Sequence, residues 1–296
     1  MSHRKPQPPL LSAAELFRIV TLRLADDWRA DRPHRVELNA AAVHDMRINL
    51  RKARTALKLF EPILPDVFYR TADRSLRTLA RRFDVARDLD VLRDEILPKL
   101  RTASGGANSR SMRSLSTRID AAARKARTVD QKRRSRRQKT DAPLVESARL
   151  MTAIVAAGQR LRDSEAARRP GRKFLRARIE KMAARARRRL ARASEDDRPA
   201  LHRLRIALKQ LRDTQLLSRD FLARRQRIDL APLRRATAAL GELQDYERAR
   251  VLLTSLLHDD PRLAEPVTAA VWRLETFHRA AAPRALKLAR RALRDP

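Results

Sequence analysis

The chain has 296 residues, and its 69 Lys and Arg against 35 Asp and Glu give a formal net charge of +34 at pH 7. A charge of this size repels itself in a folded chain and indicates a polyanionic partner, such as nucleic acid, polyphosphate or an anionic membrane. Only 5 Gly and few aromatic residues are present, which argues against a sheet-rich protein, because strands use aromatic residues and their turns use Gly. The absence of Cys excludes disulfides, thiolate metal sites and a thiol nucleophile. We therefore expect an all-α protein, since Ala, Leu and Arg dominate the composition.

Helical periodicity recurs along the chain after residues 1–9, which are expected to be a flexible N-terminus. The start of the chain has no unbroken apolar core before Glu15, so no secretory signal is predicted. Asn39 and Asp197 are expected to be N-caps, because each side chain can accept a hydrogen bond from the first turn that follows. Helices are predicted over residues 11–30, 40–60, 67–100 (one helix or two), 112–127, 144–162, 173–193, 199–222, 233–257 and 263–293.

Breaks in the periodicity mark the connecting segments. Residues 104–109 (SGGANS) form the clearest loop, and residues 169–171 (RPG) the next. Residues 124–139 hold nine basic residues and one Asp. This run is either an additional anion-binding arm or the end of a solvated helix that continues into a disordered linker before Pro143, and we prefer the second interpretation.

The longest apolar stretches, residues 153–157 and 251–257, are too short to cross a bilayer. No membrane span is therefore predicted, and we expect a soluble, cytoplasmic protein. An amphipathic helix could still lie on a membrane surface, but the apolar faces of these helices are expected to be used in the core.

An internal repeat is the most informative feature of the sequence. Residues 44–59 (HDMRINLRKARTALKL) align without a gap with residues 202–217 (HRLRIALKQLRDTQLL). A second pair of segments follows at nearly the same separation, residues 83–92 (FDVARDLDVL) and 240–249 (LGELQDYERA), and this pair matches Asp88 with Asp245. The chain is therefore interpreted as a duplicated helical unit.

Helical geometry places the cations of the first repeat on one face. At 100° per residue, positions 44, 47, 51, 54 and 58 lie within an arc of about 80°. The second repeat has the same spacing, except that Leu216 stands in place of Lys58. Like charges at this spacing destabilise an isolated helix, and a bound polyanion would reverse that cost. The predicted anion-binding residues are His44, Arg47, Arg51, Arg54 and Lys58 in the first repeat, and His202, Arg205, Lys209 and Arg212 in the second.

Each His begins one of these cationic faces. The neighbouring Arg side chains are expected to oppose its protonation in the free protein, whereas a bound anion would favour it and could accept its hydrogen bond. A metal site with His44, Asp45 and Asp88 is the competing interpretation, but the surrounding cations would repel a divalent ion, so no metal or other cofactor is predicted. Asp88 and Asp245 are interpreted as structural acceptors that either orient basic side chains or cap the turn between helices.

Two unrepeated stripes of cations are weaker candidates for the same surface. Their spacing also places each set on one helix face. For these stripes and for the repeated faces alike, the alternative is a solvated helix surface, with or without acidic partners from a neighbouring helix. They comprise Arg70, Arg74, Arg77 and Arg81, and then Arg178, Lys181, Arg185, Arg188 and Arg192.

These motifs resemble the CHAD family, the conserved histidine α-helical domain. The resemblance rests on HDMRINLRKARTALKLF with ARDLDVL in the first half and on LHRLRIALKQLRDTQLL with LGELQD in the second. It implies a CHAD domain over residues 10–294, with a first repeat at about 10–140 and a second at about 141–294. It further implies two helical bundles related by a pseudo-two-fold axis, with a basic central groove or pore that binds inorganic polyphosphate through the nine residues named above. Gln244 at the position of Arg87, and Ser218 at that of Phe60, depart from strict symmetry.

The expected function is non-catalytic binding of polyphosphate, with the protein associated with polyphosphate granules in the cytoplasm. Polyphosphate has no bases, so its receptor needs closely spaced cations and no stacking platform. Single-stranded nucleic acid binding usually adds aromatic platforms, whereas Phe17, Phe60, Phe83, Phe221 and Phe277 fit apolar helix positions. Sequence-independent binding of a nucleic-acid backbone remains the alternative.

An enzyme is the third possibility that the sequence raises. No Walker-type loop, dense carboxylate metal site, nucleophile with a base, or Glu-x-Glu-x-Lys signature of a triphosphate-processing domain is present. The conspicuous side chains are cations, so no catalysis and no catalytic residues are predicted.

Overall fold

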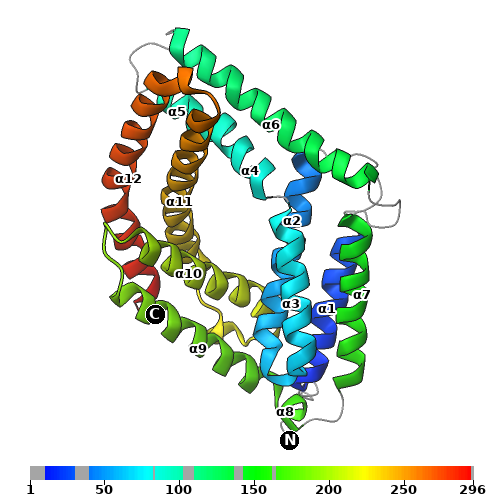
Figure 1. The fold of residues 1–296 in the computed structure, drawn as a ribbon. Coiled ribbons are helices and arrows are strands. Elements are labelled where there is room, and N and C mark those ends of the chain that lie inside the picture. The colour runs from blue at the N-terminus through cyan, green and yellow to red at the C-terminus, as the bar shows by residue number, and fades with distance from the viewer. Residues whose placement is uncertain are drawn as a thin grey trace, which may run out of the picture. The chain divides into compact units, whose positions relative to one another are not determined.

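The computed structural model describes residues 11–30, 40–82, 84–102, 110–136, 143–161 and 165–294. These residues form helices joined by short connections, with no strand among them and a single isolated β-bridge between Ser12 and Pro170 (Figure 1). The all-α prediction is confirmed. In the described part of the chain, no helix is both long and apolar enough to span a membrane.

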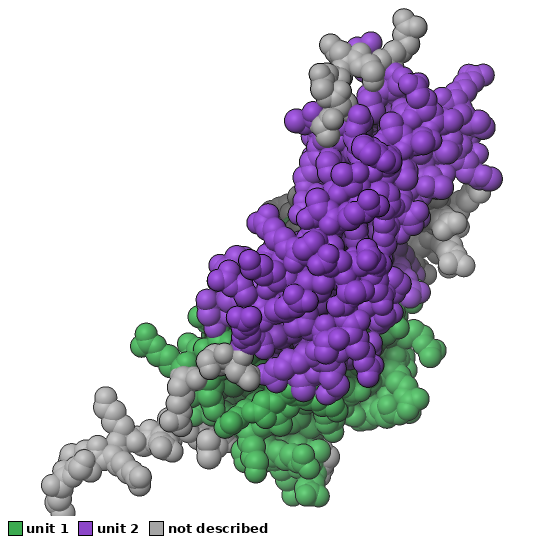
Figure 2. Space-filling model, turned by 90° about the vertical axis from the view of Figure 1, so that its left-hand side faces the viewer, with its two compact units in different colours: residues 1–79, 143–182, 213–228 green, residues 80–142, 183–212, 229–296 purple. Residues whose placement is uncertain are grey.

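The chain divides into two compact units, which Figure 2 distinguishes by colour. Each unit takes segments from both halves of the sequence. The first unit comprises residues 1–79, 143–182 and 213–228, and the second comprises residues 80–142, 183–212 and 229–296.

The two longest helices that the structure describes, α11 and α12, lie at the C-terminal end of the chain. The α-helices up to residue 136 are α1 (Ala13–Ala30), α2 (Ala40–Phe60), α3 (Asp66–Arg81), α4 (Asp84–Val91), α5 (Leu97–Thr102) and α6 (Arg110–Arg136). Those that follow are α7 (Pro143–Arg160), α8 (Glu165–Arg168), α9 (Gly171–Ala191), α10 (Arg198–Ser218), α11 (Leu230–Asp259) and α12 (Ala264–Leu293). Short 3-10 turns lie at Glu61–Ile63, Arg219–Phe221, Arg224–Gln226 and Pro261–Leu263.

The predicted helices are all present, and the largest difference is within residues 67–100. That segment contains α3, α4, a π-helical turn over Leu92–Ile96, and α5. Pro98 lacks the backbone N–H that an α-helix would direct to the carbonyl of Asp94, which interrupts the hydrogen-bond ladder at this point. The turn keeps Leu92 and Ile96 buried, so the apolar periodicity continues through the irregularity.

The expected caps and loops are only partly within the described residues. Asp197 caps α10 as predicted, because its Oδ1 accepts a hydrogen bond of 2.8 Å from the backbone N–H of Ala200. Asn39, Phe83, residues 1–9 and the loop at 104–109 lie outside the described residues. The basic run beginning at residue 124 is helical as far as Arg136, where α6 ends.

The core of the first unit forms where α1 packs against α2 and α7. Three aromatic rings occupy its centre. The ring of Phe60 lies 5.2 Å from that of Phe17 and 5.6 Å from that of Phe174, measured between centroids. Leu50 and Leu57 are fully buried on the same face of α2 as Phe60, so the opposite face of α2 is the one that presents its cations.

Close backbone contact fixes the start of α9 in the first unit. The backbone N–H of Gly171 donates to the carbonyl of Leu11 at 2.7 Å. A Cβ at residue 171 would lie 2.4 Å from Leu16 Cδ1 and 2.6 Å from the Leu11 carbonyl oxygen. Only glycine fits here without a shift of the chain.

The second unit is built around α11 and α12, which pack side by side along much of their length (Figure 1). Apolar residues of both helices form one cluster with α6, the π-helical turn and α5. Arg198 at the start of α10 also donates to Glu247 on α11 and to Glu275 on α12. These ion pairs hold the N-terminal end of α10 against both long helices, which positions its cationic face.

Candidate anion-binding site

The face predicted on α10 is present in the second unit. His202, Arg205, Lys209 and Arg212 are half-buried, whereas Leu204 and Leu208 on the opposite side are fully buried. The amphipathic pattern therefore divides this helix as the sequence predicted, with an apolar side in the core and a cationic side away from it.

Cations from three helices, α4, α10 and α11, lie near Arg205. Burial lowers the pKa of its guanidinium. Asp245 on α11 opposes that shift, and the charges of Arg248 on α11, Arg87 on α4 and Arg212 on α10 add to it. A guanidinium remains protonated in proteins, so Arg205 is a buried cation in the free protein, and three neighbouring arginines repel it.

Two aspartates partly neutralise this cluster. Asp88 Oδ1 accepts hydrogen bonds from Arg248 Nη1 at 2.9 Å and from Arg87 Nη1 at 3.4 Å. Asp245 Oδ1 lies 3.9 Å from Arg87 Nη1, and burial raises the pKa of its carboxyl, although Arg87, Arg205 and Arg248 oppose the rise. Asp88 therefore orients two arginines, as the sequence predicted, and Asp245 contributes charge.

Three buried polar atoms of this cluster have no hydrogen-bond partner among the described residues. They are His202 Nδ1, Arg205 Nε and Asp245 Oδ1. Buried polar atoms in folded proteins are nearly always hydrogen-bonded, so a group of unsatisfied atoms in one place requires an explanation. Arg205 Nε carries a proton and His202 Nδ1 can carry one, so both can donate to an oxyanion.

His202 is held neutral in the free protein. Burial lowers the pKa of its imidazole, a hydrogen bond with Gln244 opposes that shift, and the charges of Arg205, Arg248 and Arg203 add to it. The sequence predicted this direction from the Arg neighbours alone. An anion bound here would offset the Arg charges and favour the imidazolium.

The corresponding face on α2 lies in the first unit and has more acidic neighbours. Arg51 Nε is 3.3 Å from Asp213 Oδ2, and Arg54 Nε donates to Asp73 Oδ1 at 3.0 Å. Burial alone would raise the pKa of Asp73, but the hydrogen bonds and charges of Arg54 and Arg77 hold it below its ordinary value. Two of the five residues of the predicted face, Arg51 and Arg54, are thus paired with acids of the same unit.

The α2 face also contains Arg47, Lys58 and His44. Arg47 and Lys58 are half-buried on the same side of the helix as Arg51 and Arg54. The backbone of His44 lies in α2, and its side chain is outside the described residues. The structure therefore supports a shared cationic face from Arg47 to Lys58.

A family model and solved structures agree with this fold. The model of the CHAD domain matches residues 20–254, which is most of the chain. The chain belongs to the CHAD family. It superimposes on the crystal structure of the CHAD domain from the plant Ricinus communis with a TM-score of 0.73 and 22% identity, covering 98% of this chain and 94% of that one. It also matches PptA from Streptomyces chartreusis, with a TM-score of 0.69, 17% identity, and coverage of 95% and 99%. No curated protein matches the sequence.

One residue of the predicted α9 stripe of this CHAD protein, Arg178, does not lie on a cationic surface. Arg178 on α9 is buried, and it donates to the backbone carbonyls of Leu59 and Lys58 at 2.9 and 2.5 Å. It satisfies carbonyls at the C-terminal end of α2, where a helix leaves acceptors unpaired. Its role is to join α9 to α2 within the first unit.

The stripe on α3 is also partly paired. Arg70 donates to Asp66 and Arg77 donates to Asp73, one helical turn away in each case. The pair of Arg70 with Asp66 is an exposed i,i+4 pair of the kind that adds a few tenths of a kcal/mol to a helix. Arg70 therefore behaves as part of an ordinary solvated helix surface, whereas Arg77 shares the largely buried Asp73 with Arg54.

The sequence did not predict that Arg87 and Arg248 belong to the cationic cluster around Arg205. The internal repeat gave no signal for either, because Gln244 and Val91 stand at the equivalent positions. A usable signal was the helical spacing of Asp245 and Arg248, which are three residues apart and therefore share a face of α11. Within the described residues, no group of three or more His, Asp or Glu side chains is arranged to hold a metal ion.

Proposed function

We propose that this CHAD protein binds inorganic polyphosphate without transforming it, through the basic faces of α10 and α2. The observation that supports this most directly is the cluster around Arg205, where four arginines and two aspartates meet in the second unit. The unsatisfied N–H at Arg205 Nε can donate to a phosphoryl oxygen, and His202 Nδ1 can do so once a bound anion favours the imidazolium. The resemblance to the CHAD family implies the same ligand.

The aromatic residues favour polyphosphate over single-stranded nucleic acid. Phe17, Phe60 and Phe174 pack on one another in the core of the first unit. Tyr246 is buried on α11 and donates to Glu242 at 2.6 Å. Base stacking needs accessible aromatic faces beside the phosphate-binding cations, and these four rings are used in packing.

Polyphosphate binding would act by charge-assisted hydrogen bonds alone. The arginines around Arg205 serve as bidentate donors, and Lys209 serves as a point charge. None of these side chains is a general base or a nucleophile at neutral pH, so the proposed role is retention of the polymer. A protein with this activity would be located on polyphosphate granules in the cytoplasm.

A competition experiment tests the proposal. The full chain is loaded with labelled single-stranded DNA, and long-chain polyphosphate is added at equal phosphate concentration and fixed salt. We expect polyphosphate to displace the DNA and to bind more tightly. Failure to displace it, or weaker binding than DNA, would show that the nucleic-acid alternative is correct.

Variants locate the binding face. Arg205→Gln with Lys209→Gln should weaken polyphosphate binding and lower the slope of log Kd against log salt by about 1.5 units, since two phosphate contacts are lost. The matched control is Arg262→Gln with Arg279→Gln, which removes the same charge from exposed positions of the second unit. An equal change in both variants would mean that only net charge matters.

A further inference from the structure

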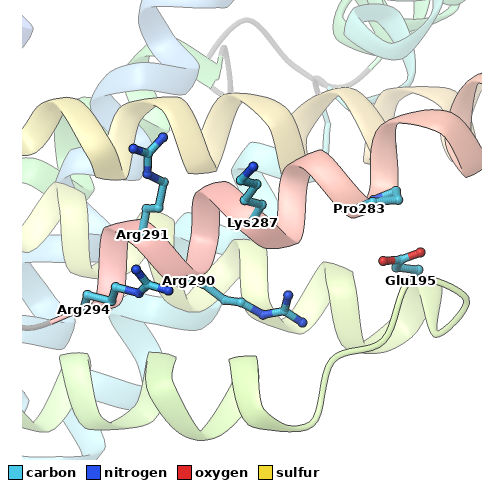
Figure 3. Close-up of a pocket in the computed structure, with 6 residues that line it drawn as sticks. All are labelled: Glu195, Pro283, Lys287, Arg290, Arg291 and Arg294. Atoms are coloured by element: carbon cyan, nitrogen blue, oxygen red, sulfur yellow. The ribbon is translucent and has the colours of Figure 1, made fainter.

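A second group of cations lies at the C-terminal end of α12, and it shares no residue with the α10 face. A pocket of about 600 Å³ is lined there by Lys287, Arg290, Arg291 and Arg294, with Pro283 and Glu195 completing its wall. Figure 3 shows the four cationic side chains leaving successive turns of α12, with Glu195 on the loop that follows α9. All six residues belong to the second unit.

Helical geometry explains how the four cations share this pocket. Positions 287, 290, 291 and 294 lie within an arc of about 100°, and they extend along the axis by about 10 Å. Leu286, Ala289 and Leu293 are buried on the other side of the helix. The packing of α12 in the core therefore fixes the direction of its cationic end.

The four cations have no ion-pair partner among the residues that the structure describes. None of them forms an ion pair or a side-chain hydrogen bond with any described residue, and Glu195 across the pocket is likewise unpaired. Other cations of this unit with acids nearby do form such pairs, as Arg198 and Arg250 do with Glu247. The pocket thus carries a net charge that nothing in the described chain neutralises.

The helix dipole explains only part of this arrangement. Cations in the last turn of a helix interact favourably with its C-terminal carbonyls, which accounts for Arg290 and Arg291. That effect falls off within one turn, so it does not account for Lys287. It also gives no reason for a concave surface between α12 and the loop of Glu195.

We propose that this pocket binds a linear oligophosphate of three or more phosphoryl groups, at a site separate from the α10 face. The three guanidinium groups match phosphoryl oxygens with paired donors, and Lys287 adds a point charge one turn earlier. A row of cations about 10 Å long faces several consecutive phosphoryl groups, whereas a single phosphate would contact one or two of them. The ligand is either a free oligophosphate or a segment of a longer chain, and both have the same chemistry.

The test measures binding of tripolyphosphate to the full chain by titration calorimetry. The pocket variant is Lys287→Gln, Arg291→Gln and Arg294→Gln. Its matched control, Arg262→Gln, Arg273→Gln and Arg279→Gln, removes the same charge from the same unit and from residues that likewise have no ion pair with a described residue. We expect the pocket variant to raise the Kd for tripolyphosphate about tenfold or more and the control to raise it far less, because local contacts outweigh net charge.

Three results would overturn the proposal. The first is an equal loss in the pocket and control variants, and the second is retention of tripolyphosphate binding in the pocket variant. The third is displacement of tripolyphosphate by a short oligonucleotide at equal phosphate concentration, which would show that the pocket does not prefer an oligophosphate.

Two additional measurements separate this site from the proposed function. Arg205→Gln with Lys209→Gln should leave tripolyphosphate binding at the pocket within about twofold, since those residues lie outside it. Loss of tripolyphosphate binding in that variant alone would overturn the pocket and leave the proposed function intact. Saturation with long-chain polyphosphate identifies the source: displaced tripolyphosphate supports a segment of the long chain, and retained tripolyphosphate supports a free oligophosphate.

Discussion

Arg248 on α11 donates from Nη1 to Asp88 Oδ1 on α4 at 2.9 Å, which joins the two helices at the centre of the cationic cluster. Arg87 donates to the same oxygen at 3.4 Å. One carboxylate therefore holds two arginines that would otherwise repel each other. The same contact stabilises the fold and arranges cations for an anion, so its removal should affect stability and binding in opposite directions.

Asp88→Asn tests this opposition. We expect the free energy of unfolding to fall by about 1 to 2 kcal/mol, because charge-assisted hydrogen bonds to Arg248 and Arg87 are weakened at a partly exposed site. Polyphosphate affinity at low salt should rise, since one negative charge is removed beside the ligand. Urea unfolding and a binding titration measure the two effects. Asp259→Asn, an exposed change on α11, is the control and should alter neither; a fall in both quantities for Asp88→Asn would contradict the prediction.

Arg205→Met should lower polyphosphate affinity without lowering the stability of the protein. The guanidinium of Arg205 is crowded by three other arginines, and its Nε has no partner among the described residues. A buried charge beside like charges is costly, and Asp245 keeps Arg87 and Arg248 as cationic neighbours when Arg205 is replaced by an apolar side chain. We expect the free energy of unfolding to be unchanged or raised by about 1 kcal/mol, while polyphosphate affinity falls. A strongly destabilised variant would show that Arg205 is mainly structural.

The sequence predicted the helices and the α10 face because both depend on local periodicity. A spacing of three or four residues places His202, Arg205, Lys209 and Arg212 together whatever surrounds them. The pairing of Arg248 with Asp88 could not be predicted in the same way, since it depends on α11 packing against α4. Long-range contacts of this kind have no signal in the spacing of one segment.

Arg178 is a second case in which helical spacing did not predict a contact with another helix. Its spacing placed it in a stripe with Lys181 and Arg185, yet the structure buries it against the end of α2. Helical position alone does not distinguish a solvated Arg from one that reaches carbonyls of a neighbouring helix. The acidic partners of Arg51 and Arg54, which are Asp213 and Asp73, were likewise visible only in three dimensions.

Protonation of His202 and His278 should make the free protein less stable in acid. Burial lowers the pKa of both imidazoles in the folded state, and the charges of Arg205, Arg248 and Arg203 lower that of His202 further. Near His278, Arg198 lowers the pKa, whereas Glu275, Glu247 and Asp196 oppose the shift. The unfolded chain therefore binds protons first, at the ordinary His pKa near 6.5.

The free energy of unfolding should accordingly fall as the pH drops through 6.5, until the folded-state pKa values are reached. Urea unfolding at pH 7.5 and 5.5 measures the effect, and His278→Gln with His202→Gln should reduce it. Bound polyphosphate should raise the pKa of His202, so its affinity should increase over the same interval. An affinity that is independent of pH would exclude His202 from the site.

Arg178→Met should destabilise the protein without changing its ligand binding. The substitution removes the donors to the carbonyls of Lys58 and Leu59 at the end of α2, so the free energy of unfolding should fall by about 2 to 3 kcal/mol. The salt dependence of polyphosphate binding should remain that of the unmodified chain. Lys181→Gln, an exposed change on the same helix, serves as the control and should leave stability within about 0.5 kcal/mol. A weaker dependence of the polyphosphate Kd on salt in Arg178→Met would show that Arg178 contacts the ligand.

Gly171→Ala should be the more damaging of two glycine substitutions in the first unit. A methyl group at residue 171 would meet Leu16 Cδ1 at 2.4 Å and the Leu11 carbonyl oxygen at 2.6 Å. The backbone oxygen cannot rotate away, so we expect a loss of about 1 to 3 kcal/mol in the free energy of unfolding. Gly158→Ala is the matched comparison, because its nearest neighbour, Phe17 Cδ1, is 3.3 Å away and belongs to a side chain that can shift. Urea unfolding of both variants measures the difference, and equal losses would show that contact with the backbone of Leu11 does not restrict the start of α9.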